Sequence, residues 1–364
     1  MEFVRPALAA STIGARRTRP SQALRPLRQC LHTSAPRTAT PLPHPTVPGP
    51  PPQPPQSSTS QAQDRKKKQA ELLQRGQALK TNPAKPASAL AKKFWKDASV
   101  KETPEGLQIM LDSRPVRTSN KQILTLPHNK RALATAIALE WDLLVSAQQA
   151  LKHHYIPLTS LTSRAVDIQA ADSKGNIDIR ESIMKMMMRY LGTDTLLCWA
   201  PEKNIHDAGL DKLESRPRSL RETQVAVAEP IIAFLKTHIF PGVDFQPQDQ
   251  DSIMPTPQPK MTQEVIKGWI MGLPAFELAA LERGVLASKS LLVAIRLVVE
   301  WSKEFRDLQS NKSSGNRFGI AQAAEACSVE VTYQTNMWGE VEDTHDVNKE
   351  DLARQLGSVI LLVN

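Results

Sequence analysis

The chain has 364 residues and a formal net charge of +9 at pH 7, but the charge is distributed unevenly. Residues 1–88 carry 14 basic and 3 acidic side chains, which leaves 32 basic against 34 acidic side chains in the rest. A nucleic-acid-binding domain needs its positive charge on the folded part. Nucleic acid is therefore not an expected partner, and about 275 residues remain for folded domains with cores of their own.

Residues 1–37 have the composition of a mitochondrial presequence. They contain seven Arg, no Lys, several Ser and Thr, and one acid, Glu2. Such Arg-rich and acid-poor stretches are typical of transit peptides, whereas a secretory signal needs a continuous apolar region. We expect import into the mitochondrial matrix and removal of this segment, with a disordered basic tail as the alternative.

Residues 38–88 are Pro-rich and then basic and polar, with a charge run at 65–68. Such a segment cannot bury enough apolar surface to offset its ordering entropy, so we predict a disordered linker. The basic run could contact RNA or acidic lipid, but a solvated charge run is the favoured interpretation.

The longest apolar stretch, Val285–Val299, is interrupted by Lys289 and Arg296. It is too short to span a bilayer, so stable membrane insertion is not expected. Cys198 and Cys327 stand alone, which indicates neither a disulfide framework nor a Cys-based metal site.

Residues 89–158 read as a two-layer α+β domain. Turn residues separate three short strands predicted at Trp95–Lys101, Leu107–Leu111 and Val116–Leu126, which would form a β-meander. Asn129 is expected to cap the helix that follows. The apolar positions of this helix share one face that can cover the sheet: Leu133, Ile137, Trp141 and Leu144.

Residues 159–364 are mostly helical in pattern, and we predict an orthogonal all-α bundle as a second, C-terminal domain. Thr195–Trp199 could be a strand that returns to the first sheet. The helices are expected at 159–171, 176–191, 220–238, 261–271, 274–286, 287–306, 319–337 and 348–362.

No motif for catalysis, a cofactor or a metal is found. His153 and His154 are adjacent, so on a helix they would diverge by about 100° and are read as an exposed helix end. Gly284–Ser290 resembles a phosphate-binding loop, but Ser288 replaces its essential second Gly, so a helix N-terminus is expected. With neither a dinucleotide fingerprint nor a nucleophile elbow, we predict a protein that is not an enzyme.

Two further segments stand out. Four Met within Met184–Met188 either pack the core or leave part of an adaptable apolar surface accessible. Glu330, Tyr333, Gln334 and Trp338 would share one side of a helix that Gly339 ends, and an acidic loop with Glu342 follows. Acid, amide and aromatic side chains together are typical of protein interfaces. The alternative is a buried Trp and Tyr with a solvated rim.

Several short elements occur in an order that resembles the assembly-chaperone family which binds the α subunit of the F(1) sector of mitochondrial ATP synthase. The sequence departs from that family at Ser113, Ser119 and Ala228, and residues 307–316 look like an insertion. The matching elements are Lys93–Lys96, Leu111–Thr118, Leu126–Pro127, Ala138–Asp142, Ile156–Asp167, Tyr190–Asp194, Pro230–Ile232 and Tyr333–Gly339.

The resemblance implies a matrix chaperone that shields the surface of the unassembled α subunit that later contacts β, and we expect it to act as a monomer. It also implies a functional acid on the last long helix, which corresponds to Glu330 and could pair with a basic group of the client. The expected partner-binding residues are Glu330, Tyr333, Gln334, Trp338 and Glu342. The alternative function is that of a mitochondrial RNA- or ribosome-associated factor using the basic run at 65–68.

Overall fold

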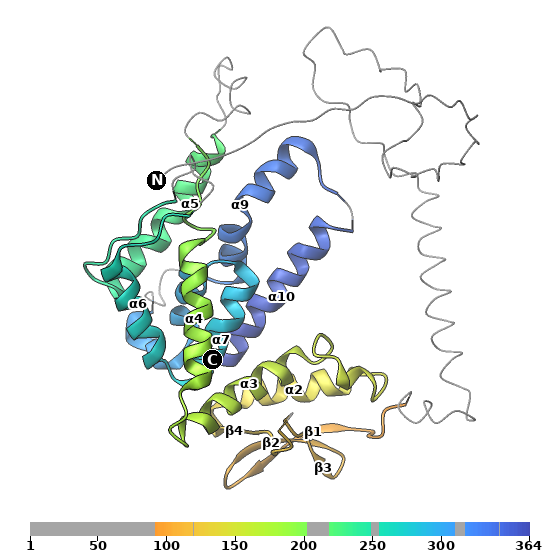
Figure 1. Cartoon of the computed structure of the whole chain (residues 1–364). Helices are drawn as coiled ribbons and strands as arrows, with labels where there is room; N and C mark the ends of the chain where they lie inside the picture. Colours follow the sequence, from red (N-terminus) through yellow and green to blue (C-terminus); the bar gives the residue numbers. More distant parts are fainter. Residues whose placement is uncertain (1–91, 119, 202–217, 249–254, 310–316, 342) are drawn as a thin grey trace, which may run out of the picture. The chain divides into compact units, whose positions relative to one another are not determined.

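A small antiparallel sheet opens the described part of the chain, and helices follow it (Figure 1). The computed structural model describes residues 92–118, 120–201, 218–248, 255–309, 317–341 and 343–364. The predicted presequence and linker, residues 1–88, therefore lie outside the described residues.

The sheet is centred on β2 (Gly106–Leu111). It pairs antiparallel with β1 (Ala98–Thr103), and also with β3 (Arg114–Pro115) and β4 (Thr125–Leu126). Gly106 permits the turn before β2, because its φ is +144° and a Cβ there would lie 2.2 Å from the Leu126 carbonyl oxygen.

The prediction of one strand from Val116 to Leu126 is wrong. The chain reverses within this stretch: the Thr118 amide donates to the Gln122 carbonyl (2.8 Å), and Lys121 adopts a left-handed φ of 63°. A local turn thus replaces the continuous ladder, which leaves only an isolated bridge between Arg117 and Ile123 beside the two short strands.

Helix α2 (Arg131–Asp142) packs against β1 and β2, as predicted. Its predicted core positions Leu133, Ile137 and Trp141 are buried, and so is Leu144. The predicted Asn129 cap is wrong: a 3-10 turn, η3 (His128–Lys130), precedes the helix. Asn129 lies inside that turn, in which the Lys130 amide donates to the Pro127 carbonyl (3.0 Å), and no side chain caps the start of α2.

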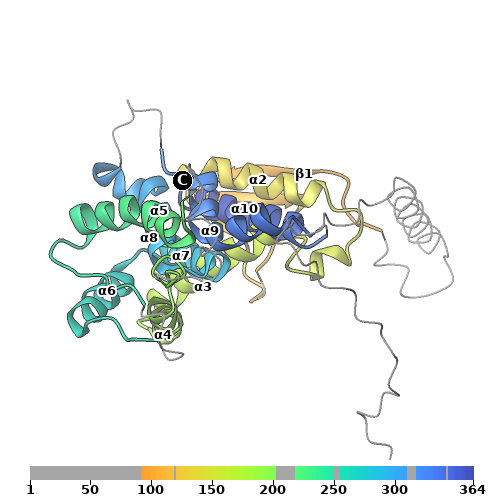
Figure 2. The ribbon, with the colours of Figure 1, turned by 90° about the horizontal axis from the view of Figure 1, so that it is seen from above.

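Helices make up most of the remaining chain, with α7 in the middle of them in both views (Figures 1 and 2). Helix α7 packs against α3, α8 and α10. The elements are η4 (Gln149–Leu151), α3 (Pro157–Asp172), α4 (Asp178–Gly192), α5 (Leu220–Phe234), the π-helical turn η7 (Leu235–Ile239), α6 (Lys260–Gly272), α7 (Ala275–Ser288), α8 (Leu291–Trp301), the 3-10 turns η8 (Lys303–Leu308), α9 (Ile320–Trp338) and α10 (His345–Val363).

The predicted helix at 287–306 begins too early. Helix α7 ends where Lys289 adopts a left-handed φ of 58°, and Ser290 caps α8 by accepting a hydrogen bond from the Val293 amide (3.1 Å). Only the last residue of the Gly284–Ser290 segment stands at a helix N-terminus, because the segment from Gly284 to Ser288 belongs to α7.

Thr195–Trp199 is not the strand that its residues made possible, because it begins with a turn and its last two residues have no regular secondary structure. The Asp194 carboxylate accepts a hydrogen bond from the Leu196 amide (3.0 Å), and the Leu197 amide donates to the Asp194 carbonyl (2.9 Å). The amides of Leu196 and Leu197 therefore donate to Asp194 and not to a neighbouring strand.

One buried cluster of apolar side chains runs from Trp95 beside the sheet to Val363 in α10. Met184 and Met187 belong to it, while Met186 and Met188 are partly buried against it, so the Met segment mainly packs the core. The fold is mixed, helix-rich and built on a small antiparallel sheet. The orthogonal arrangement of the helices and the domain division at 158/159 stay predictions. Among the described helices none is long and apolar enough to cross a membrane.

Candidate functional site

Helices α9 and α10 extend beyond the core as an antiparallel pair (Figure 1). In α9 the buried residues are Ala323 and Ala326, both in its first half, whereas in α10 they lie between Leu356 and Val363, in its second half. The halves next to the connecting loop therefore lie outside the core. We call residues 330–341 and 343–350 the arm.

The arm carries several exposed large apolar side chains. They are between 39 % and 58 % exposed: Val331, Met337, Trp338, Val341 and Val347. These side chains come from α9, from α10 and from the segment between them. Contiguous exposed apolar surface marks sites for protein partners. The arm is therefore a candidate docking surface.

The structure brings Glu330, Tyr333, Gln334 and Trp338 together on the arm. Glu330 is exposed, Tyr333 and Gln334 are half-buried, and Gln334 Nε2 donates to Glu330 Oε1 (3.0 Å). Gly339 ends α9 with a φ of +90°, as predicted. Trp338 is 52 % exposed, which rules out the alternative in which this side chain is buried. Glu342 lies outside the described residues.

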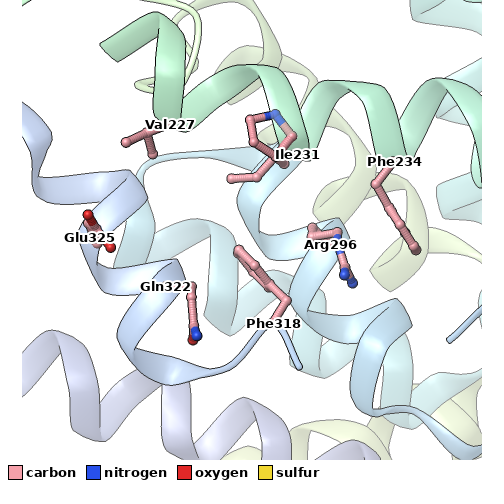
Figure 3. Close-up of a pocket in the computed structure, with 8 residues that line it drawn as sticks. Val227, Ile231, Phe234, Arg296, Phe318, Gln322 and Glu325 are labelled. Carbon is pink, nitrogen blue, oxygen red and sulfur yellow. The ribbon is translucent and has the colours of Figure 1, made fainter. Parts of the chain in front are cut away.

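A pocket lies at the base of the arm, between α5, α8 and α9 (Figure 3). Its volume is about 370 Å³, within the range of about 300–1,000 Å³ for small-ligand sites. Gln322 and Glu325 of α9 line it on one side. The remaining lining comes from Val227, Pro230, Ile231 and Phe234 of α5, from Arg296 of α8 and from Phe318.

Arg296 is held in this pocket by aromatic rings and by a buried acid. Its guanidinium carbon lies 3.7 Å from the centroid of the Phe234 ring and 5.0 Å from that of Phe318. Arg296 Nη1 donates to Glu300 Oε2 (2.6 Å), and Arg317 Nε donates to Glu300 Oε1 (3.2 Å). Burial lowers the pKa of Arg296, and the Glu300 carboxylate opposes that effect.

This cluster was not identified from the sequence. Arg296 was considered there only as a charge that interrupts a possible membrane span. The spacing of Arg296 and Glu300 at i and i+4 on one helix could have indicated the pair. Arg317, which is 17 residues from Glu300, joins it only through the fold.

A second buried acid, Asp194, has a structural role. Its Oδ2 accepts hydrogen bonds from the amides of Leu291 (2.8 Å) and Leu292 (3.0 Å) at the N-terminus of α8. Burial raises the pKa of Asp194 to about 6, against the opposing effect of these hydrogen bonds. The carboxylate thereby joins the end of α4 to the start of α8.

Among the described residues, the other candidate reactive groups are the two cysteines and His153. Burial raises the pKa of the Cys327 thiol to about 12, and it also raises that of Cys198, so both are poor nucleophiles. His153 is exposed, and its Nδ1 lies 2.9 Å from Ser160 Oγ. Within the ranges that the structure covers, no three His, Cys, Asp or Glu side chains are placed to hold a metal ion.

Comparison with known proteins identifies the family. A family sequence model described as "ATP12 chaperone protein" matches residues 92–236. "Protein atp12, mitochondrial" of Schizosaccharomyces pombe is 31% identical over 272 residues, covering 74% of this chain and 81% of that protein. The chain belongs to the ATP12 chaperone family. The resemblance found in the sequence is thus confirmed.

Other ATP12 proteins agree with this assignment. "Protein ATP12, mitochondrial" of Saccharomyces cerevisiae is 28% identical over 286 residues, covering 74% of this chain and 82% of that protein. The crystal structure of Atp12 from Paracoccus denitrificans superposes with a TM-score of 0.52 at 22% identity, over 74% of this chain and 96% of that chain. That likeness supports the fold. ATP12 proteins are chaperones, a class distinct from enzymes.

Proposed function

We propose that this ATP12-family protein is a matrix chaperone for the F(1) sector of mitochondrial ATP synthase. It binds the unassembled α subunit and shields the surface that later contacts the β subunit. The observation that carries the proposal is the arm, where exposed apolar side chains lie beside the Glu330 carboxylate.

The physical need for such a chaperone follows from the client's surface. A subunit surface that becomes buried on assembly is apolar, and it aggregates when it is exposed. An apolar surface of the chaperone can cover it without nucleotide hydrolysis. Release then comes by competition, because the β subunit covers the same area more extensively.

Glu330, Tyr333, Gln334 and Trp338 are the proposed client contacts. Trp and Tyr supply large contact areas, and they are enriched among the residues that dominate binding energy. The Glu330 carboxylate is suited to pair with a basic group on the client and so to set the docking register.

The location in the matrix is supported by two independent observations. Residues 1–37 have the composition of a presequence, and both fungal relatives are named mitochondrial proteins. The matrix is also where an imported α subunit is first exposed without its partner.

The test is co-purification from mitochondria. The full-length chain, tagged through a flexible linker after Asn364, is captured without added nucleotide, and bound proteins are identified by mass spectrometry. We expect free α subunit without β in the eluate. Enrichment of a different matrix protein with α absent would overturn the proposal.

Deleting residues 38–88 separates this function from an RNA-associated one. The chaperone proposal predicts that capture of α is retained, because the arm lies outside this segment. Loss of function together with loss of bound RNA would favour the alternative that uses the basic run at 65–68.

A further inference from the structure

The pocket at the base of the arm is not explained by the contacts proposed so far. Its walls are apolar side chains of α5 together with Phe318, and its α9 side is formed by Gln322 and Glu325 (Figure 3). We propose that this pocket receives one large apolar side chain of the client, and that Glu325 at its edge pairs with a basic residue next to that side chain. The inference rests on the proposed function.

The pocket continues the arm along α9. Gln322 and Tyr333 are eleven residues apart on α9, which at 3.6 residues per turn places them on the same side of the helix. Glu325 and Glu330 then fall on opposite flanks of the line that joins Gln322 to Tyr333. A client segment lying along this line reaches both the pocket and the arm.

The size and lining of the pocket suit a large apolar side chain. At about 370 Å³ it has room for a large side chain, and Val227, Ile231 and Phe234 offer apolar contact along one wall. Filling such a space removes apolar surface from water on both partners. Residues that fill well-packed pockets in this way usually carry much of the binding energy of an interface.

The accessible charge at the edge of the pocket is negative. Arg296 reaches the pocket, but it is only 7 % exposed, lies over the Phe234 ring and bonds the buried Glu300 carboxylate. Glu325 is exposed at the other end of the pocket from Arg296 (Figure 3). A neighbouring side chain of the client therefore meets a carboxylate, and Glu330 extends the negative charge along α9. This favours a basic residue over an acidic one.

The test compares pocket variants with matched surface variants. Each tagged chain is co-expressed with the α subunit, and the ratio of α to chaperone in the eluate is measured. We expect Val227→Trp, which fills the pocket, to lower this ratio at least about tenfold. Ile177→Trp, at a half-exposed position at the start of α4, should leave it unchanged.

The charge is tested by Glu325→Lys, with Glu105→Lys in the turn before β2 as the control. Both positions are exposed, so neither change should lower the melting temperature appreciably. We expect Glu325→Lys to lower capture several-fold and Glu105→Lys to leave it unaltered. A benzoyl-phenylalanine at Gln322 should crosslink to the α subunit, and one at Ile177 should not.

The outcomes separate the two proposals. Capture of α by the wild type, with equal capture by Val227→Trp and Glu325→Lys, would overturn the pocket inference and leave the proposed function intact. Failure of the wild type to capture α would overturn both. If Val227→Trp lowers the melting temperature, the Glu325→Lys ratio and the Gln322 crosslink decide the matter, because neither substitution changes the apolar wall that α5 contributes.

Discussion

Gln334 donates a hydrogen bond to Glu330 across one turn of α9, with 3.0 Å between Nε2 and Oε1. The bond limits the orientations of the carboxylate but leaves its charge intact, because the donor is a neutral amide. Glu330 is thus oriented on an exposed helix in the region where the apolar side chains of the arm gather.

Replacing Glu330 by Lys should lower capture of the α subunit about tenfold or more. The change removes the proposed attraction to a basic client group and adds a repulsion. Because Glu330 is exposed, the free energy of unfolding should stay within about 0.5 kcal/mol of the wild type. Co-purification measures the first effect and urea denaturation the second. Glu264→Lys on α6 is the control, and capture equal to that of the wild type would remove Glu330 from the site.

Replacing Asp194 by Asn should destabilise the fold by about 2 kcal/mol at pH 7. The carboxylate accepts hydrogen bonds from three backbone amides, and an Asn side chain must turn its NH₂ group toward at least one of them. Urea denaturation measures the loss. A stability equal to that of the wild type would mean that these bonds contribute little.

The same variant should change how stability depends on pH. Burial raises the folded-state pKa of Asp194 from its ordinary value of 3.8 to about 6, so the folded state binds the proton more tightly than the unfolded state. The contribution of Asp194 to stability is therefore greatest below its ordinary pKa, falls as pH rises from about 4 to about 6, and is constant above. The stability difference between wild type and Asp194→Asn should decline over that window, and a flat difference would contradict the raised pKa.

Replacing Glu300 by Ala should destabilise the fold by about 3–5 kcal/mol, because it leaves the buried Arg296 without its acid. Arg317 also loses its ion pair with this carboxylate. The matched control is Glu181→Ala, which breaks the exposed i,i+4 pair with Lys185 and should cost less than about 0.5 kcal/mol. Equal effects of the two variants, measured by urea denaturation, would show that burial of the Arg296 pair does not matter.

Replacing Gly284 by Leu should destabilise the fold by about 1–3 kcal/mol or more through overpacking. A Cβ at this position lies 3.0 Å from Ala294 Cβ on α8 and 3.7 Å from Val359 Cγ2 on α10. Gly268→Leu on α6 is the control: nothing lies within 4 Å of its Cβ, so the better helix propensity of Leu should make the change neutral or stabilising. Thermal melting of both variants checks the contrast. A melting temperature of Gly284→Leu equal to that of the wild type would show that α7 can shift away from its neighbours.

Local pattern was a reliable guide where the deciding interactions are close in sequence. The face of α2 that carries Leu133, Ile137 and Trp141 is buried as its spacing predicted. Gly339 ends α9, because a positive φ suits glycine. The segment of α9 with Glu330 and Trp338 was likewise identified from composition and spacing alone.

Prediction failed where a distant or competing partner decides the backbone. Val116–Leu126 has the residues of a strand, yet a turn at Thr118–Gln122 divides it. Thr195–Trp199 was a possible strand of the sheet, but the Asp194 carboxylate bonds its Leu196 amide and the start of α8 instead. Asn129 lies inside the 3-10 turn η3 and not at the N-cap position of α2.

The sequence by itself determined the family, the helix faces and the residues of α9 that are candidates for binding, because each depends on residue order or on spacing within one element. Only the tertiary structure decided that the arm lies beyond the core, that Arg317 joins Arg296 at Glu300, and that α5 and α9 enclose a pocket. These features depend on contacts between residues far apart in the chain. A local sequence pattern does not specify which distant side chains pack together or where they leave a pocket.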